Sequence, residues 1–254
     1  MPTKTGIYYS YFSGGISQVG SPPLVLIHGA GGTHLHWPPE LRRMEGVEVF
    51  GIDLPGHGRS EGQPEKSIEG YASRLTEWMD ALGLNRAVLI GHSMGGGISL
   101  TLSMQAPERV AGMVLVGSGA KLRVHPQILS LTETEGSFQQ AAELITTWAF
   151  STHTGARIKE LALSRMMEVP AHVMHADFQA CDRFDMMDIL SEIMVPTLVI
   201  CGLQDQLTPA KFSRYLADQL PNATLELVEG AGHMVMLEKP EALVGPLRTF
   251  LKHL

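Results

Sequence analysis

The segment "AVLIGHSMGGG", residues 87–97, places one serine among glycines at the end of a short apolar run. Residues 87–90 are continuously apolar, which is typical of a strand buried on both faces of a parallel sheet. After the glycines, an apolar pattern resumes at Ile98, Leu100 and Leu102, and its length and regularity favour a helix. The segment therefore predicts a strand, a tight turn and a helix, with Ser93 at the turn.

Residues 91–95 match the pattern Gly-x-Ser-x-Gly. At so tight a turn, side chains in place of the two glycines would collide with the neighbouring strand and helix, while the serine hydroxyl must project at the start of the helix. A five-residue pattern with two free positions also arises by chance, and a plain glycine-rich connection is the alternative. The predicted strand, turn and helix around the pattern favour a nucleophilic serine.

Similar apolar runs recur along the chain, and each of them ends in Gly, Asp or Ser. Helix-like stretches lie between most of the runs, for example residues 67–84 and 210–220. This alternation predicts an α/β fold with a mostly parallel sheet and helices on both faces. Ligands bind such sheets beyond the carboxyl ends of the strands. The runs occupy residues 23–29, 47–53, 87–93, 112–118, 197–202 and 223–230.

One interval of nearly eighty residues, between Ser118 and Thr197, contains no convincing strand. Its patterns predict several helices, interrupted near Gly155 and Pro170. We therefore expect a core domain formed by residues 1–120 and 188–254, with residues 121–187 as a helical insertion over the edge of the sheet. A length of 254 residues suits one domain with such an insertion.

Charge and hydropathy exclude several classes of partner. The net charge is −7, and no block of Lys or Arg is present, so nucleic acid and anionic membrane surfaces are poor candidates. No apolar stretch reaches 18 residues and no secretory leader is evident, which predicts a cytoplasmic protein without a membrane span. Of the two cysteines, Cys201 lies inside an apolar run, and the fold requires no disulfide.

A serine hydroxyl is a weak nucleophile unless a base removes its proton and a carboxylate orients that base. Asp205 follows the run that ends at Gly202, and His233 follows the next run. Four acids in or beside the insertion are rivals for the orienting carboxylate, but none of them follows a predicted strand. These rivals are Asp177, Asp182, Asp185 and Asp188.

Five motifs in order along nearly the whole chain resemble those of the α/β-hydrolase superfamily, which also has the order Ser, Asp, His. The resemblance implies that Ser93 is the nucleophile, His233 the general base and then the general acid, and Asp205 the acid that holds the imidazole. It also implies that the insertion is the family's cap. The motifs are "HGAGG" at 28–32, "DLPGHGRS" at 53–60, "GHSMGG" at 91–96, "GLQDQLTP" at 202–209 and "GAGHMVMLEKP" at 230–240.

The oxyanion formed by attack on a carbonyl needs two preorganised N–H donors. The backbone N–H of Met94, at the start of the predicted helix, is one candidate. By resemblance, the other is the N–H of Ala30, which follows His-Gly. Gly31 and Gly32 would let that backbone approach a substrate closely.

Candidates for substrate binding are less well defined. Gly31 follows Ala30 in the predicted oxyanion loop, which is the segment 28–32. His92 precedes the predicted nucleophile, and Met234 follows the predicted base. The His92 side chain is expected to point away from Ser93 Oγ and to contribute shape rather than proton transfer. Several methionines in and beside the insertion fill core gaps or line an acyl or alcohol pocket, and the sequence does not separate these roles. They are Met166, Met167, Met174, Met186 and Met187.

Other polar residues are expected to be structural. His28 is expected to brace the oxyanion loop by hydrogen bonding. The turn at residues 53–60, which contains Asp53, His57 and Arg59, is explained by backbone geometry. His34 and His36 suggest a metal, yet no carboxylate or cysteine follows at ligand spacing, so we expect no metal site.

Together these features predict a serine hydrolase that needs no cofactor, a carboxylesterase cleaving neutral small-to-medium acyl esters through an acyl-enzyme. The insertion has six Lys and Arg against eight Asp and Glu, which offers no clamp for an anionic substrate. Dehalogenases and epoxide hydrolases on this scaffold need a carboxylate where Ser93 stands. The chain alone leaves monomer and homodimer open.

Alternatives remain within and outside the enzymes. A C–C bond hydrolase or a lactonase of aromatic degradation is the nearest. C–C hydrolases usually carry Asn before the serine and Trp after the histidine, where this chain has His92 and Met234. Monoacylglycerol lipases and perhydrolases share the same three residues. A ligand-binding sensor with slow turnover is the alternative from a different class.

Overall fold

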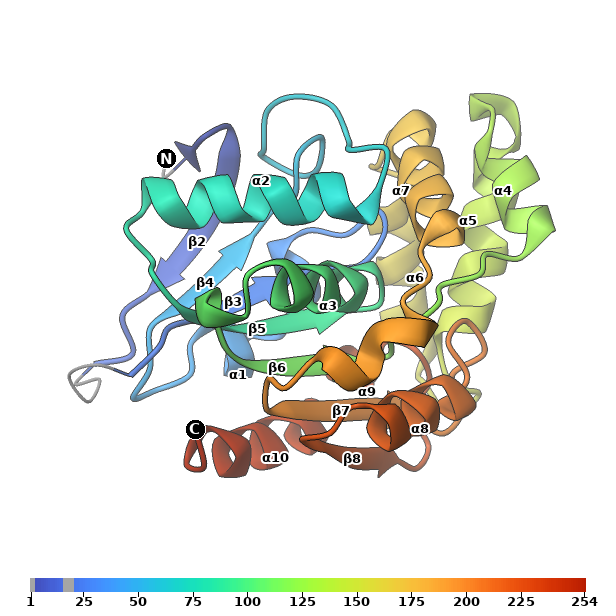
Figure 1. Cartoon of the computed structure of the whole chain (residues 1–254). Helices are drawn as coiled ribbons and strands as arrows, with labels where there is room; N and C mark the ends of the chain where they lie inside the picture. The colour runs from blue at the N-terminus through green and yellow to red at the C-terminus, as the bar shows by residue number, and fades with distance from the viewer. Residues whose placement is uncertain (1–2, 16–20) are drawn as a thin grey trace.

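The computed structural model describes residues 3–15 and 21–254 (Figure 1). One eight-stranded sheet has the strand order β1-β2-β4-β3-β5-β6-β7-β8. Strands β3 to β8 run parallel to one another. Strand β2 pairs antiparallel with β4, and β1 pairs antiparallel with β2 at the outer side of the sheet. The strands are β1 (Thr3–Lys4), β2 (Ile7–Phe12), β3 (Leu24–Ile27), β4 (Val49–Ile52), β5 (Ala87–His92), β6 (Val110–Val116), β7 (Thr197–Gly202) and β8 (Ala223–Val228).

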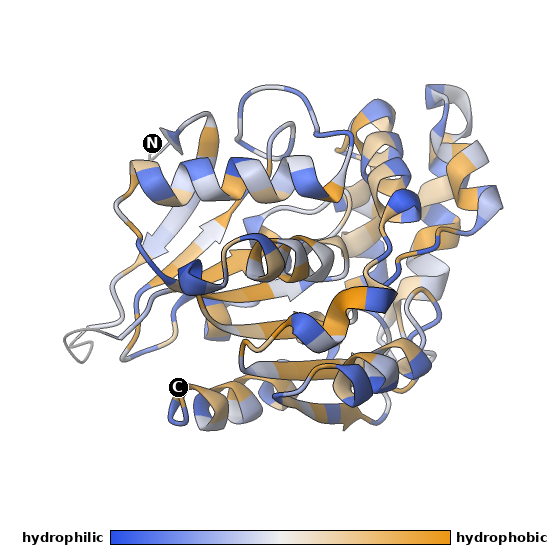
Figure 2. Cartoon of the chain, viewed as in Figure 1, coloured by the Kyte–Doolittle hydropathy of each residue, from blue (hydrophilic) through white to orange (hydrophobic). Residues whose placement is uncertain are grey.

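All six apolar runs form strands, so the predicted mostly parallel α/β sheet is confirmed. Successive side chains of a strand point to opposite faces of the sheet. In β3, Val25 and Ile27 enter one apolar cluster, while Leu24 and Leu26 enter the cluster on the other face. Figure 2 shows how the apolar residues gather on these central strands.

Helices cover both faces, as predicted. The first cluster includes residues of α2 (Ile68–Ala81), α3 (Met94–Gln105) and α8 (Ala210–Gln219). The second includes residues of α1 (Pro39–Arg42), α9 (Val235–Glu238) and α10 (Glu241–Leu251). Helix α2 begins where the sequence predicts, because the Ser67 side chain accepts a hydrogen bond from the Gly70 N–H at 3.1 Å. None of the helices in the described ranges is both long and apolar enough to cross a membrane.

Four helices lie between β6 and β7: α4 (Pro126–Thr132), α5 (Glu135–Ala149), α6 (Ala156–Met166) and α7 (Ala171–Arg183). Gly155 and Pro170 stand at the N-terminal ends of α6 and α7, where interruptions were expected. A β-bridge pairs Lys121 with Asp185, and a short 3₁₀ helix, Met187–Glu192, leads to β7. In Figure 1 the four helices stand together beyond the arrowheads of β5 and β6. We call residues 121–187 the helical insertion.

Candidate active site

Ser93 lies in the turn between β5 and α3 with φ 51° and ψ −114°. A positive φ is uncommon for a residue with a side chain and marks a strained turn. The flanking glycines are required by backbone contacts. A Cβ atom on Gly91 would lie 2.2 Å from the Gly95 carbonyl oxygen, and one on Gly95 would lie 2.3 Å from the Ile27 carbonyl oxygen. The predicted strand, turn and helix are therefore present, and the turn leaves Ser93 half-buried.

Hydrogen bonds to both backbone groups of Ser93 hold the turn in place. The Ser93 N–H donates to the Val116 carbonyl at 2.9 Å, and the Ser118 hydroxyl donates to the Ser93 carbonyl at 2.8 Å. These bonds tie the turn to the end of the adjacent strand β6. The Ser93 side chain is thereby presented at the carboxyl edge of the sheet, next to the helical insertion.

Asp205 and His233 meet at the same edge of the sheet. His233 Nδ1 lies 2.8 Å from Asp205 Oδ2, and both residues are 5% exposed. The other carboxylate oxygen, Oδ1, accepts the N–H groups of Leu207 at 2.9 Å and Thr208 at 2.8 Å. Because both oxygens have donors, the carboxylate is fixed in orientation, and it fixes the imidazole in turn.

Thr208 adds a contact that the sequence analysis did not anticipate. Its hydroxyl oxygen lies 2.8 Å from Asp205 Oδ2, 3.1 Å from His233 Nδ1 and 2.8 Å from the Gly117 carbonyl oxygen. Gly117 has φ 52°, and a Cβ atom there would lie 3.2 Å from His233 Nδ1. The motif "GLQDQLTP" was the available signal, since it places a threonine three residues after the aspartate.

Ser93 and His233 line one cavity. Among the described residues, no hydrogen bond joins Ser93 Oγ to His233. Catalytic hydrogen bonds are often long or poorly aligned before substrate binds. The arrangement therefore places a serine hydroxyl and an oriented imidazole at one site, as acyl transfer requires.

The loop after β3 also lines the cavity. The Gly32 N–H donates to the Gly29 carbonyl at 3.0 Å, which closes a turn with Ala30 and Gly31 at its centre. In the described part of the chain, neither the Ala30 N–H nor the Met94 N–H has a protein acceptor. Gly31 has φ 61°, a conformation that favours glycine. The two predicted oxyanion donors are thus unengaged.

His28 braces this loop, as expected. Its Nε2 accepts the Leu54 N–H at 2.9 Å, so Nδ1 carries the proton and donates to the Gly29 carbonyl at 2.8 Å. Burial lowers the pKa of His28 to about 3, which keeps the ring neutral. His28 therefore links the loop after β3 to the segment that follows β4.

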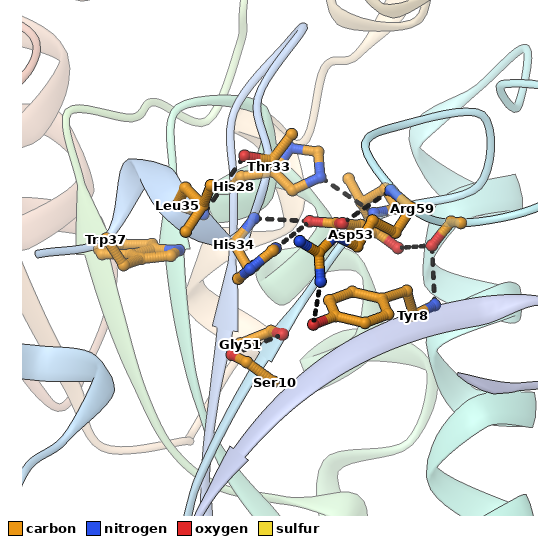
Figure 3. A network of polar contacts seen from close by, with 12 residues as sticks. Tyr8, Ser10, His28, Thr33, His34, Leu35, Trp37, Gly51, Asp53 and Arg59 are labelled. Carbon is orange, nitrogen blue, oxygen red and sulfur yellow. Dashed lines mark hydrogen bonds and ion pairs between the residues drawn. The ribbon is translucent and has the colours of Figure 1, made fainter. Parts of the chain in front are cut away.

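The turn at residues 53–60 forms the polar network of Figure 3. Asp53 Oδ1 accepts the backbone N–H of His34 at 2.7 Å and lies 2.8 Å from its Nδ1, while Oδ2 accepts the Arg59 N–H at 3.0 Å. The Arg59 guanidinium lies over the Tyr8 ring and reaches the Tyr8 hydroxyl at 3.2 Å. His34 is thus occupied by Asp53, and the described residues contain no cluster of three or more side chains that could hold a metal ion.

His92 is 3% exposed and packs against His233. Its Nε2 donates to the His233 carbonyl at 3.1 Å, and the two rings are 4.6 Å apart between centroids. Burial lowers the pKa of His92 well below its ordinary value, so the ring is neutral. His92, Gly31 and Met234 all line the cavity, which keeps them candidates for substrate contacts.

The cavity has a volume of about 1420 Å³ and lies between the sheet edge and the helical insertion. Of the five methionines singled out, only Met166 lines it; Met174 and Met186 are in the core, and Met167 and Met187 are exposed. Arg123, Arg157 and Arg165 also line the cavity, which counting charges along the insertion did not reveal. Its apolar lining from the insertion includes Ile128, Ile145, Trp148, Leu161, Met166 and Val169.

Three of the four rival acids have other partners, and the fourth, Asp188, is exposed. Asp182 Oδ1 accepts the Val124 N–H at 3.1 Å, and Asp185 pairs with Lys121 at 2.5 Å. Asp177 is fully buried and pairs with His57 Nε2 at 2.7 Å. Asp205 is the acid whose carboxylate reaches His233.

Comparison with known protein families matches residues 24–245 to a family described as "Alpha/beta hydrolase family". The chain belongs to the alpha/beta hydrolase family. The sheet, the covering helices and the serine turn described above accord with this membership, and the chain is a hydrolase of this family.

Several known proteins are similar to this chain over almost their full length. A protein of Caulobacter sp. (strain K31) named "Putative carbamate hydrolase RutD" is 29% identical, covering 98% of this chain and 97% of that protein. A solved structure titled "Structure of a thermophilic esterase" is 31% identical with a TM-score of 0.81, covering 97% and 98% of the two chains. A structure titled "Est816 as an N-Acyl homoserine lactone degrading enzyme" is 28% identical with a TM-score of 0.84 and covers 96% of each chain.

Proposed function

We propose that this alpha/beta hydrolase is a serine carboxylesterase that cleaves neutral small-to-medium acyl esters through an acyl-enzyme. The observation that carries the proposal is the buried Asp205–His233 pair at 2.8 Å, beside a cavity that Ser93 also lines. A buried carboxylate that orients an imidazole toward a serine is the arrangement that activates a hydroxyl for attack on a carbonyl.

The reaction proceeds in two halves. Ser93 Oγ attacks the ester carbonyl carbon while His233 Nε2 takes the hydroxyl proton, and the Asp205 carboxylate stabilises the resulting imidazolium. The carbonyl oxygen becomes an oxyanion that accepts the N–H groups of Ala30 and Met94. Collapse expels the alcohol, which takes the proton from His233. A water molecule, deprotonated by His233, then attacks the acyl-enzyme and releases the carboxylic acid and Ser93.

Cavity size and lining support an ester substrate with an apolar acyl group. Ligand pockets usually span about 300–1,000 Å³, so 1420 Å³ is far more than a carbamate of a few atoms needs. Arg165 is paired with Glu168 at 3.0 Å, and Arg123 lies 3.8 Å from Asp182. Because the side chains of Arg123 and Arg165 are more than half exposed and Arg157 is exposed as well, water screens all three, and a neutral substrate suits the cavity better than an anionic one.

Lactone hydrolysis is the second candidate, favoured by the 28% identical structure of an enzyme that degrades N-acyl homoserine lactones. A lactone is a cyclic ester, so the same attack and the same oxyanion apply, and the leaving alkoxide stays attached to the acyl group. The large apolar cavity has room for the acyl chain of such a compound.

The test is hydrolysis of p-nitrophenyl esters with acyl chains of two to sixteen carbons by the wild type, Ser93→Ala and Ser73→Ala. Ser73 is an exposed serine of α2 and serves as the matched control. We expect rapid turnover that peaks at short or medium chains, is lost in Ser93→Ala and is retained in Ser73→Ala.

Other outcomes point elsewhere. Turnover of acyl homoserine lactones, measured by acid release, without turnover of the open esters would overturn the esterase in favour of the lactonase. No turnover of either class, together with a rise in melting temperature on ligand addition, would indicate a binding protein.

A further inference from the structure

Helix α7 of the insertion carries Asp177, a fully buried carboxylate that has no part in the proposed catalytic steps. Its Oδ2 accepts the Gly31 N–H at 2.8 Å and lies 2.7 Å from His57 Nε2, while Oδ1 accepts the Tyr71 hydroxyl at 2.6 Å. These partners come from the oxyanion loop, the turn after β4 and helix α2. One side chain of the insertion therefore contacts three separate segments outside the insertion.

His57 carries a positive charge in this arrangement. Its Nε2 faces Asp177 Oδ2 at 2.7 Å, and its Nδ1 faces the Pro55 carbonyl oxygen at 3.0 Å. Each nitrogen must bear a proton to donate to an acceptor, so the ring is an imidazolium. Burial alone would lower the pKa of His57, but the negative charge of Asp177 raises it above its ordinary value. Burial would raise the pKa of Asp177, but the His57 charge and the hydrogen bonds lower it.

The contact with Gly31 reaches the oxyanion loop itself. Ala30 and Gly31 are the central residues of the turn closed by the Gly32 N–H and the Gly29 carbonyl. The peptide between the two central residues of such a turn has opposite orientations in the two common turn types. Asp177 accepts the N–H of that peptide, so it fixes one orientation. This peptide begins at the carbonyl group of Ala30. Ala30 is also the residue whose own N–H is the proposed oxyanion donor.

A second residue of α7 contacts the same glycine. Met174, one helical turn before Asp177, packs so closely that a Cβ atom on Gly31 would lie 2.1 Å from Met174 Cε. Residues three apart on a helix share one face. This face of α7 is therefore seated directly on the turn that carries Ala30.

We propose that Asp177 is a positioning residue, which holds the Ala30 N–H in place for the oxyanion from within the helical insertion. The inference rests on the proposed function, since acyl transfer through a tetrahedral intermediate is what needs this donor. It follows that hydrolysis depends on α7 being seated, because a displaced α7 releases the Ala30–Gly31 peptide.

The test compares the wild type with Asp177→Asn, and with Asp182→Asn as the matched control on the same helix. The asparagine keeps the size of the side chain but removes the charge that holds the Gly31 N–H and the His57 imidazolium. We expect kcat per titrated active site to fall by about ten- to a hundredfold, with KM changed less than about twofold. Asp182→Asn should retain the wild-type kcat.

A second readout reports the oxyanion hole directly. Ser93 Oγ adds to the carbonyl carbon of an alkyl trifluoromethyl ketone while its proton passes to His233, and the tetrahedral adduct bears the oxyanion. The affinity for this ketone should therefore fall by the same factor as kcat. A purely structural role would lower the melting temperature and the fraction of active sites, with kcat per active site and ketone affinity unchanged. That result would overturn the assignment of Asp177.

Tyr71→Phe keeps the test decisive where Asp177→Asn does not fold. It removes one hydrogen bond to Oδ1 and leaves the Gly31 contact, so kcat and ketone affinity should fall together by a few fold at constant KM. A fall in melting temperature alone would contradict the inference. Failure of the proposed function has a different signature, namely no turnover and no ketone adduct dependent on Ser93 in the wild type.

Discussion

Thr208 lies within hydrogen-bond distance of three groups at the candidate active site, among them Asp205 Oδ2 and His233 Nδ1. An ionised carboxylate can only accept, so Thr208 steadies Asp205 by donating its one proton to Oδ2, and its lone pairs can accept the His233 Nδ1–H. Together with the backbone N–H groups on Oδ1, it leaves Asp205 little freedom to rotate. At the scale of single residues, the orientation of His233 is therefore set by several contacts.

Asp205→Asn should lower kcat by roughly 10³- to 10⁴-fold with little change in stability. The amide can present an N–H toward His233 Nδ1, which favours the tautomer that cannot accept the Ser93 proton. Steady-state hydrolysis of a p-nitrophenyl ester measures the effect. Asp188→Asn, at an exposed acid outside the cavity lining, is the control. Near-normal activity of Asp205→Asn would show that another acid orients the base.

At the junction of β5 and α3, backbone atoms lie so close to Gly91 and Gly95 that no larger side chain fits. Local packing, and not the chemistry of the reaction, therefore requires glycine at both positions. An alanine methyl at Gly95 would meet the carbonyl oxygens of Ile27 and His28 at 2.3 Å and 2.8 Å. Backbone atoms of a central strand cannot move aside without breaking the sheet. The turn therefore dictates its glycines independently of the reaction.

Gly95→Ala should lose several kcal/mol of unfolding free energy, on the scale of severe overpacking. Gly136→Ala, in α5, should instead gain roughly 0.5–1 kcal/mol, because nothing lies within 4 Å of the added methyl and the unfolded chain loses freedom. Urea unfolding of both variants measures the difference. A Gly95→Ala protein as stable as the wild type would contradict this description of the turn.

The contact of α7 with the sheet edge should depend on pH. The raised pKa of His57 contributes stability fully below about pH 6.5, which is lost as pH rises through the folded-state pKa. The lowered pKa of Asp177 contributes stability above about pH 3.9, which is lost as pH falls through its folded-state pKa. Asp53, His28 and Tyr71 also face His57, and His28 is neutral in this range.

The difference in unfolding free energy between the wild type and Asp177→Asn should therefore be largest between about pH 4 and pH 6.5 and should shrink at alkaline pH. Urea unfolding at pH 5, 7 and 9 measures it. A difference that stays the same at pH 5, 7 and 9 would show that His57 is neutral in the folded protein and that no ion pair forms with Asp177.

At the scale of the whole molecule, the cavity lies between the sheet edge and the insertion, so the candidate catalytic residues and much of the apolar lining come from different parts of the chain. Helix α6 has no buried residue, and Leu161 is 55% exposed although it lines the cavity. An apolar side chain in that position gains burial when an acyl chain occupies the cavity.

Leu161→Ser should raise KM for long-chain p-nitrophenyl esters by about three- to tenfold, because less apolar surface is buried on binding. The acetate ester should be unaffected. Met194→Ser removes an exposed apolar side chain away from the cavity and is the control. An equal change for short and long esters would argue against contact between α6 and the acyl chain.

The sequence predicted the sheet and the meeting of Asp205 with His233 because strand ends in a parallel sheet share one edge. It did not reveal the Asp177 cluster, because Asp177 and Gly31 are 146 positions apart and such pairing depends on how the insertion docks. The antiparallel strand β2 was also missed, since "IYYSYF" shows no clean alternation of buried and exposed residues.

Ser93 is the proposed nucleophile of an acyl-transfer reaction. The most direct measurement is labelling of the wild type with an alkyl fluorophosphonate, followed by peptide mass spectrometry. We expect one adduct per chain, on Ser93, with loss of ester hydrolysis in proportion to labelling and no adduct in Ser93→Ala. Loss of hydrolysis with Ser93 unmodified, or an adduct on another residue, would contradict it.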